Sequence, residues 1–328
     1  MTPPFRDLVL IGICTYRRPE LEATLNSLRD LAPCGLPVSI AIADNDETPS
    51  AQSRVAGIAA THPLAITYLH APKGNISIAR NALLDHARSI GARLLVFMDD
   101  DETAEPGWLA ALVRAWQTPP DGRAAGAVLG PVTAHHGPKA PDWMRQARAH
   151  DTLPVYDGDG AITSGYTCNV LIDLADPAMS GLRFDPLRGR AGGEDSAFFA
   201  AFLAAGGQIA FAPQAMLHET VPAERARLAW LMRRRYRMGQ THASLIVQGR
   251  PWTGRMGAAA VAGAKALACG GMALIGVARP AWRNRQLMRA ALHVGAVAYL
   301  GGARQIEIYG NSQQARPDAA LHSGSKER

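Results

Sequence analysis

Residues 99–102, Asp-Asp-Asp-Glu, directly follow the apolar run 94–98. In an extended chain, Asp99 and Asp101 point to one face and Asp100 to the other. Two like charges about 4 Å apart repel by roughly 4 kcal/mol at a surface-like dielectric, and a divalent cation removes that cost. Oxygen ligands alone suit Mg²⁺ or Mn²⁺. The alternative is that these acids only cap the next helix, although one cap needs one acid.

The segments around this cluster alternate between strand-like and helix-like patterns. Apolar runs typical of buried strands occur at 8–14, 37–43, 64–70, 92–98 and 124–132. Amphipathic patterns typical of helices lie between them, at 19–31, 76–90 and 107–116. Repeated β-α units with short connections predict a right-handed, mostly parallel α/β sheet covered on both faces. Such sheets bind ligands at the carboxyl ends of their strands, where the acidic cluster lies.

The second half of the chain is less regular. Residues 134–160 are rich in Pro, Gly and His and are expected to form a loop or lid. The remaining expected elements are a strand over 162–173, a helix beginning near Glu194, a short strand over 208–213, and a helix over 222–239 that ends at Gly239 and carries six arginines.

Charge is unevenly distributed along the chain. Residues 1–222 hold 17 Lys and Arg against 24 Asp and Glu, a net of −7, whereas residues 223–328 hold 17 against 4, a net of +13. The basic part could face nucleic acid, an anionic membrane or a phosphorylated substrate. Few aromatic residues accompany it to stack bases, so nucleic acid is disfavoured. The four scattered cysteines and the lack of a signal peptide favour a reducing, cytoplasmic location.

Two apolar stretches, 257–278 and 290–303, lie in the basic part, with four arginines between them. The first is long enough to span a bilayer, but its Gly and Ala content and Lys265 make it weakly hydrophobic. We expect an interfacial or re-entrant pair of helices on the anionic cytoplasmic membrane surface. The alternative is an Ala-rich helical hairpin packed on the core.

Five motifs in this order resemble the family 2 glycosyltransferases of the GT-A fold: ICTYRRPELEATLNSL, IADND, KGNISIARN, FMDDDE and GGEDSAFF. The resemblance covers roughly residues 8–245. It implies a GT-A domain over 1–245, and the remaining chain divides into a basic, apolar helical region over 246–310 and a disordered tail over 311–328. The Gln-x-x-Arg-Trp signature of processive synthases is missing, which favours one sugar added per acceptor.

The resemblance also implies roles for donor-site residues. Thr15, Tyr16 and Arg17 would wrap the nucleotide, and Asp44 would contact a uracil ring. Arg80 would sit near the base, where Asn81 would support the donor pocket. Asp99 would lie near the ribose and, together with Asp101, would hold the metal. Asp100 would also lie on the donor side.

The resemblance of GGEDSAFF to the family's acceptor-side Glu-Asp pair makes Asp195 the candidate catalytic base, and acid–base chemistry supports this role. Inversion by single displacement needs one carboxylate to take the proton of the acceptor hydroxyl. Asp195 follows two glycines and opens a helix, whose positive end favours an ionised carboxylate. Glu194 would orient or contact the acceptor. Ordinary N-terminal helix acids are the alternative. A histidine near His218 can complete the metal site in related enzymes, although a lone histidine is more often packed.

The expected activity is therefore metal-dependent, inverting transfer from a nucleotide-diphosphate donor, a UDP-sugar by resemblance, to a lipid-linked or surface glycan. Arg234 and Arg235 could bind the diphosphate of the acceptor or of the leaving group. An NAD(P) oxidoreductase is disfavoured because the first strand leads into TYRRPE, without GxGxxG. The alternative of another class is a non-catalytic nucleotide-sugar-binding or assembly-scaffold protein.

Overall fold

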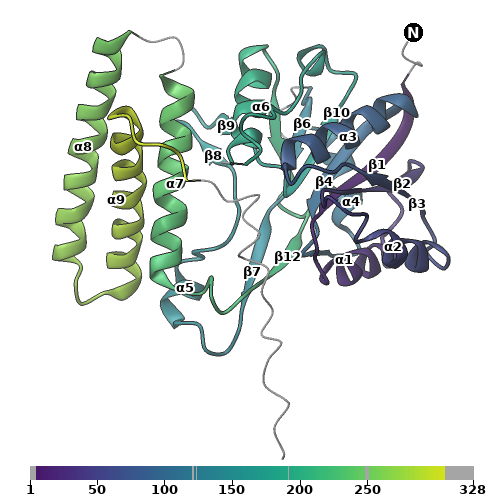
Figure 1. Cartoon of the computed structure of the whole chain (residues 1–328), viewed down its shortest axis with the longest axis horizontal. Coiled ribbons are helices and arrows are strands. Elements are labelled where there is room, and N and C mark those ends of the chain that lie inside the picture. The colour runs from purple at the N-terminus through teal and green to yellow at the C-terminus, as the bar shows by residue number, and fades with distance from the viewer. Residues whose placement is uncertain (1–4, 120–121, 123, 191, 248–250, 307–328) are drawn as a thin grey trace, which may run out of the picture.

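The computed structural model describes residues 5–119, 122, 124–190, 192–247 and 251–306 of the chain. An α/β part contains the strands, and three long helices lie together on one side of it (Figure 1). These helices are α7 (Leu228–Ile246), α8 (Trp252–Ile275) and α9 (Pro280–Leu300). The predicted tail over 311–328 lies outside the described residues.

The α/β part is built on a seven-stranded sheet of order β11-β6-β10-β4-β1-β2-β3. Its strands are β1 (Arg6–Thr15), β2 (Val38–Asp44), β3 (Ala65–His70), β4 (Ala92–Asp99), β6 (Ala127–Leu129), β10 (Asn169–Asp173) and β11 (Ile209–Phe211). Within the described chain, β10 runs antiparallel to β4 and β6, and the other pairs are parallel. The predicted mostly parallel α/β sheet is confirmed.

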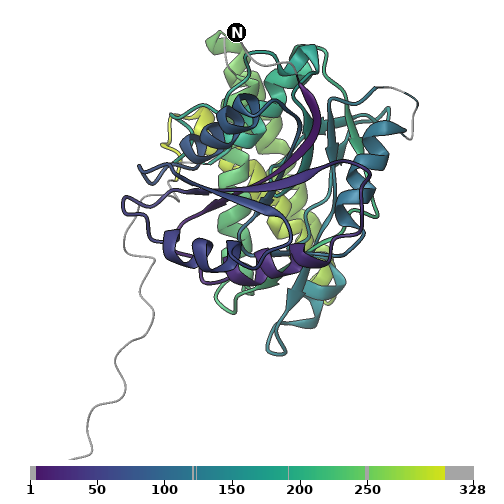
Figure 2. The same cartoon turned by 90° about the vertical axis from the view of Figure 1, so that its right-hand side faces the viewer.

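Both faces of the sheet are covered by helices, as the continuous apolar runs predict. Val9, Ile11 and Ile13 of β1 pack in one core with α1 (Leu21–Ser27), α2 (Gln52–Ala59) and α4 (Trp108–Gln117). Leu10 packs on the other face with α3 (Ile76–Ser89) and α6 (Glu194–Ala204). Figure 2 shows α3 on one side of the sheet and α1 and α2 on the other.

A smaller sheet, of order β5-β12-β7, continues from the carboxyl edge of the large one. It consists of β5 (Glu102–Ala104), β12 (Leu217–Val221) and β7 (Val132–His136). The single strand expected over 124–132 is therefore wrong, because the chain breaks at Gly130-Pro131, and β6 and β7 belong to different sheets.

The single strand expected over 162–173 is also wrong. It divides into β9 (Ile162–Ser164), which pairs with β8 (Val155–Tyr156), and β10. Gly165 lies in the break, packed against the ring of Phe199 where a Cβ would overlap it. The expected loop over 134–160 contains the end of β7, the short helix α5 (Asp142–Gln146) and β8.

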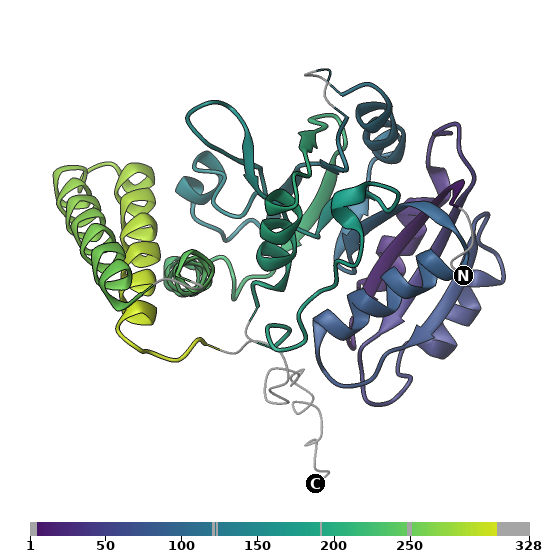
Figure 3. The same cartoon turned by 90° about the horizontal axis from the view of Figure 1, so that it is seen from above.

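The helix expected to end at Gly239 instead runs to Ile246. Gly239 packs against the backbone carbonyl of Leu292 in α9, and Gly295 of α9 packs against the carbonyl of Tyr236, so a Cβ at either glycine would overlap backbone. Gly239 therefore permits a close helix crossing rather than ending α7. Figure 3 shows α7 end-on, between the α8–α9 pair and the α/β part.

Candidate active site

The acidic cluster forms a tight turn at the carboxyl end of β4. Thr15 Oγ1 donates a hydrogen bond to Asp100 Oδ2 (2.7 Å), and Thr24 Oγ1 donates to the Asp100 carbonyl (3.0 Å). The backbone N–H of Asp99 donates to Glu102 Oε2 (2.9 Å). Among the described residues, none of these four acidic side chains accepts a hydrogen bond from the first turn of α4, whose Trp108 N–H donates to the Glu105 carbonyl, so they do not cap that helix. The turn instead projects carboxylates from the sheet edge.

The turn is electrostatically unfavourable without a cation. Burial is the main cause that raises the pKa of Asp99 and of Asp100 to about 7, and neighbouring acids add to it. Burial raises the pKa of Glu102 well above its usual value. The guanidinium of Arg18 lies 3.9 Å from Asp100 and 3.6 Å from Asp101, so it compensates only part of the charge.

The predicted ligand set of Asp99, Asp101 and His218 is not assembled around one point. Within the described part of the chain, no three His, Cys, Asp or Glu side chains are arranged to hold a metal. His218 lies inside β12 rather than after a strand, and its ring contacts Glu105 Oε1 (3.0 Å) and His135 Nε2 (2.8 Å). The donor chemistry still fits Mg²⁺ or Mn²⁺, because such ions often bind one or two carboxylates and take their other ligands from phosphates and water.

Glu219 is a carboxylate of this site that the sequence analysis missed. The antiparallel register of β12 and β5 places it opposite Glu102. Burial, and then the charge of Asp101, raise its pKa. Arg225 Nη1 lies 3.1 Å from Glu219 Oε1. The sequence held one signal for Glu219: in an extended LHETV segment, side chains alternate, so Glu219 lies on the opposite face of the strand from His218.

Asp44 is fully buried and holds the loop after β2. Its carboxylate accepts hydrogen bonds from the backbone N–H of Ala51 (2.8 Å), the Tyr68 hydroxyl (2.7 Å) and the N–H of Asp46 (3.0 Å). In this conformation it is not open to a uracil ring, because its oxygens are already engaged and inaccessible. It shapes the loop instead.

Arg17, which follows β1, pairs with the buried Asp46 of this loop. Arg17 has φ of 54°, in the left-handed region, and its Nε and Nη2 atoms each bind an Asp46 carboxylate oxygen at 2.8 Å. The hydrogen bond from Arg17 is the main cause that lowers the pKa of Asp46 to about 2. Tyr16 is 40% exposed, and the Arg17 guanidinium lies 5.3 Å from its ring centroid. An aromatic surface is thus available beside the sheet edge.

Arg80 and Asn81 are buried in α3. Arg80 forms an ion pair with Glu194 and lies over the ring of Phe184, 5.6 Å from the centroid. Asn81 binds the backbone of Phe184 twice, donating to its carbonyl (2.8 Å) and accepting from its N–H (2.9 Å). Both residues therefore support the wall of the site. Their side chains are less than a tenth exposed, so they do not present a free surface to a base.

Asp195 lies in the first turn of α6, beside Glu194. Gly192 and Gly193 have φ of 81° and 89°, a left-handed conformation that turns the chain into the helix. Asp195 is partly exposed and accepts a hydrogen bond from the N–H of Ser196 (2.6 Å). Its charge acts on both Asp99 and Arg80. The structure therefore brings the candidate base and the acidic turn to one site.

The two predicted α7 arginines lie differently. Arg234 stacks on Trp230, 5.5 Å from the ring centroid, and its charge lowers the pKa of Glu219 against the effect of burial. Arg235 is half-buried, and burial and Arg234 lower its pKa. Arg234 thus faces the acidic cluster, together with Arg225, which lies 5.8 Å from the same indole.

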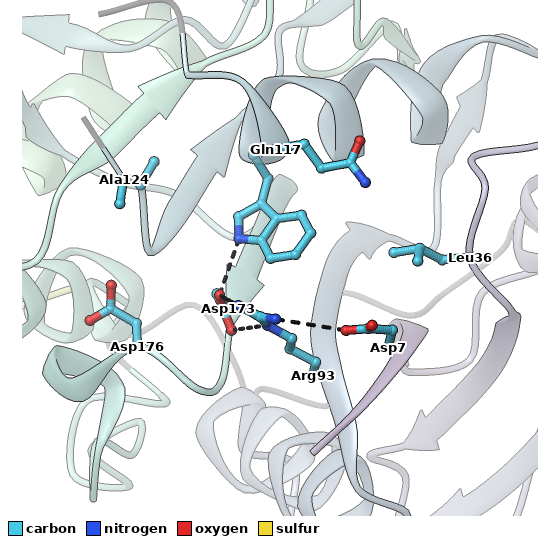
Figure 4. Close-up of a pocket in the computed structure, with 9 residues that line it drawn as sticks. Asp7, Leu36, Arg93, Gln117, Ala124, Asp173 and Asp176 are labelled. Carbon is cyan, nitrogen blue, oxygen red and sulfur yellow. Dashed lines mark hydrogen bonds and ion pairs between the residues drawn. The ribbon is translucent and has the colours of Figure 1, made fainter. Parts of the chain in front are cut away.

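A cavity of about 430 Å³ lies at the opposite, amino edge of the sheet. Figure 4 shows Arg93 between Asp173 and Asp7; the N–O distances are 3.3 Å and 3.7 Å. The Trp116 indole donates a hydrogen bond to Asp173 (3.1 Å). Arg93 and these two acids are thus mutually paired. A second cavity, of about 420 Å³, lies beside the loop after β2 and is lined by Glu47, Lys73, Asn75, Ile78, Pro186, Leu187 and Arg190.

The mixed sheet carries carboxylates at the end of β4 and a further acid at the start of α6. The chain matches the family model described as Glycosyl transferase family 2 over residues 10–167. It is 45% identical over 301 residues to the succinoglycan biosynthesis protein ExoM of Rhizobium meliloti (strain 1021), covering 92% of this chain and 95% of that protein. The chain belongs to glycosyltransferase family 2.

Solved structures of low sequence identity share the fold. The mannosyltransferase PcManGT from Pyrobaculum calidifontis, in complex with GDP-Man and Mn²⁺, has a TM-score of 0.58 at 22% identity, covering 91% of this chain and 89% of that chain. TarS 1-349 of S. aureus, in complex with UDP-GlcNAc, has a TM-score of 0.50 at 14% identity, covering 90% and 92%.

Proposed function

We propose that this glycosyltransferase transfers single sugars, with inversion, from a nucleotide-diphosphate donor to a lipid-linked or growing surface polysaccharide. The observation that carries the proposal is the placement of Asp195 beside the acidic turn, because a base and a diphosphate site are needed together. The similarity to a protein named for succinoglycan biosynthesis supports a polysaccharide acceptor.

The donor diphosphate would lie at the acidic turn. Asp101 and Asp99 would hold Mn²⁺ or Mg²⁺, which neutralises charge on the leaving diphosphate when bound. The complex of PcManGT with GDP-Man and Mn²⁺ supports a metal and a nucleotide-sugar. His218 would have to leave Glu105 and His135 to join this set, so we propose the two carboxylates as the main ligands. Thr15 orients the turn through Asp100.

The base of the nucleotide would lie near Tyr16 and Arg17, and we propose a UDP-sugar. The exposed Tyr16 ring offers a stacking surface. Asp44 would act through the loop it holds, and Asn81 through the Phe184 backbone. Because one structural neighbour is in complex with GDP-Man and another with UDP-GlcNAc, a donor screen must include both bases.

Asp195 would take the proton of the acceptor hydroxyl. The acceptor oxygen forms a bond to the anomeric carbon while the bond from that carbon to the diphosphate oxygen breaks. Glu194, held by Arg80, would position the first turn of α6. Arg234 and, on the same helix, Arg235 would meet the diphosphate of a lipid-linked acceptor. The catalytic domain would span 1–245, and region 246–310 would hold it at the cytoplasmic face of the cell membrane.

The decisive experiment measures donor binding and transfer in the same preparation. Purified protein is titrated calorimetrically with UDP- and GDP-sugars plus Mn²⁺, and then assayed with a polyprenyl-diphosphate glycan acceptor. Asp195→Asn should keep the donor Kd and lose transfer by about 10²- to 10⁴-fold. Asp142→Asn, another first-turn helix acid but highly exposed on α5, is the matched control. Donor binding without any wild-type transfer would instead favour a nucleotide-sugar-binding scaffold.

A further inference from the structure

Helix α8 carries its large apolar side chains outward and its small ones inward. Its buried residues are Ala262, Cys269 and Ala273. The outward residues include Leu267, Leu274 and Ile275, which are 80%, 77% and 87% exposed. A surface helix of a globular protein shows the opposite arrangement, with its apolar face toward the core. The outer face of α8 is therefore built for a nonpolar environment.

Seven exposed nonpolar residues line one face of α8 along the whole helix. These residues recur three or four positions apart, and we call them the apolar stripe: Trp252, Met256, Ala260, Ala264, Leu267, Gly271 and Leu274. At ~1.5 Å per residue, the stripe is roughly 33 Å long. Figures 1 and 3 show α8 at the outer margin of the molecule, and among the described elements its extensive packing is with α9. All seven stripe residues are exposed, so no described element, α9 included, covers the stripe.

Exposed arginines and indoles lie near the turn between the two helices and at their starts. Arg279 lies in the turn from α8 to α9, and the exposed Arg285 and Arg289 follow in α9. Trp252 at the start of α8 and Trp282 at the start of α9 are 72% and 46% exposed. Indoles favour the membrane–water boundary, and basic side chains favour anionic headgroups. The net charge of +13 over 223–328 agrees with this, against −7 for the rest of the chain.

A bilayer-spanning position for α8 is disfavoured by its neighbour. α9 packs along α8 and carries the exposed Arg285 and Arg289 together with the buried Asn284 and Gln286. Drawing α8 through the hydrocarbon would bring these groups with it, which is costly. A second copy of the chain is disfavoured by charge, because a two-fold contact would bring together two regions that each carry a net charge of +13.

We infer that α8 lies in the plane of an anionic bilayer, with the apolar stripe buried at the boundary between headgroups and acyl chains. The inference deepens the membrane location in the proposed function, but it concerns docking and not turnover. It makes the protein bind one leaflet without crossing it. Arg279, Arg285 and Arg289 then meet anionic headgroups at the end of the stripe where α8 turns into α9.

The test is flotation of the full chain with vesicles. One set contains phosphatidylethanolamine and phosphatidylglycerol, and the other only phosphatidylcholine. The wild type should float with the first set and less with the second. The double variant Leu267→Glu/Leu274→Glu should lose at least about tenfold in partitioning, because it places charge in the stripe. Leu187→Glu, which alters a 91% exposed leucine outside the three helices, should float like the wild type.

Two further readouts separate the other outcomes. Light scattering without lipid should show no dimer of the wild type. A dimer that the double variant dissociates would mean that a second copy of the chain covers the stripe. Leu267→Trp should add quenching by lipids brominated near the headgroup, whereas quenching by deep bromines would indicate a spanning helix. Donor titration of the double variant checks that it is folded. Flotation without transfer activity would leave the docking intact and count against the proposed function alone.

Discussion

Arg80 and Glu194 form a buried ion pair between residues 114 positions apart in the sequence. The two side chains are 8% and 5% exposed. The pair joins α3, whose next residue supports the Phe184 backbone, to the first turn of α6, which carries Asp195. One carboxylate oxygen of Glu194 has no hydrogen-bond partner within the described residues. A buried charged contact thus ties the first turn of α6, which carries the candidate base, to α3.

Replacing one member of this pair should lower the stability of the protein more than its share of the loss when both members are replaced. Arg80→Met leaves a buried carboxylate without a counter-charge, and we expect a loss of about 3–5 kcal/mol in the free energy of unfolding. The double variant Arg80→Met/Glu194→Gln should lose clearly less than the sum of the single losses. Urea unfolding of the four proteins measures this. Strictly additive losses would mean that the two side chains do not interact energetically.

Asp101 should couple metal to donor binding. With Mn²⁺ present, Asp101→Asn should weaken binding of the preferred nucleotide at least about tenfold, because one of two metal-binding carboxylates is lost. Excess chelator should have a similar effect on the wild type, and no further effect on the variant. Calorimetric titration gives both numbers. Unchanged metal-dependent binding by Asp101→Asn would remove this residue from the ligand set.

Two glycines should control the crossing of α7 and α9. Gly239→Ala and Gly295→Ala each place a methyl group where the other helix's backbone carbonyl lies, so we expect losses of about 1–3 kcal/mol or more. Gly257→Ala and Gly263→Ala in α8 meet nothing within 4 Å, and should be neutral or stabilise by up to about 1 kcal/mol. Thermal unfolding of all four tests the contrast. Equal effects in both pairs would contradict a close crossing.

His150 should make the protein less stable in acid. It is 4% exposed, stacks on Trp230, and bonds with His136 (3.0 Å) and the Arg225 carbonyl (3.1 Å). Burial is the main cause that lowers its pKa to about 4. The unfolded chain takes up a proton near pH 6.5, so this residue's contribution is complete above that pH. It is lost as pH falls toward 4, by roughly 3 kcal/mol at most.

The variant His150→Gln isolates this effect. At pH 7 it should be less stable than the wild type, because it loses the stacking on Trp230. The difference in Tm should shrink or reverse by pH 4.5, since the variant has no imidazole to protonate. Calorimetric scans across this range provide the comparison. A constant difference at every pH would show that His150 does not titrate on unfolding.

Much of the fold follows from local patterns in the sequence. The apolar runs at 8–14 and 92–98 predict buried strands, and the pattern over 76–90 predicts a helix; the structure has β1, β4 and α3 there. The acidic cluster was correctly placed at a strand's carboxyl end, because apolar periodicity stops where the strand stops. The motif order also indicated family 2 glycosyltransferases, which the family match confirms.

The partners of the site residues depended on the tertiary structure. Nothing local showed that Glu219 faces Glu102, because that follows from the register of two strands more than a hundred residues apart. In the local sequence, Gly239 looks like the glycine that ends a helix, but the structure shows that it lies where α7 and α9 cross closely. The sequence alone determined the elements and the chemistry they carry, since both depend on neighbouring residues. The fold decided which charges meet, since long-range contacts form only when the elements pack.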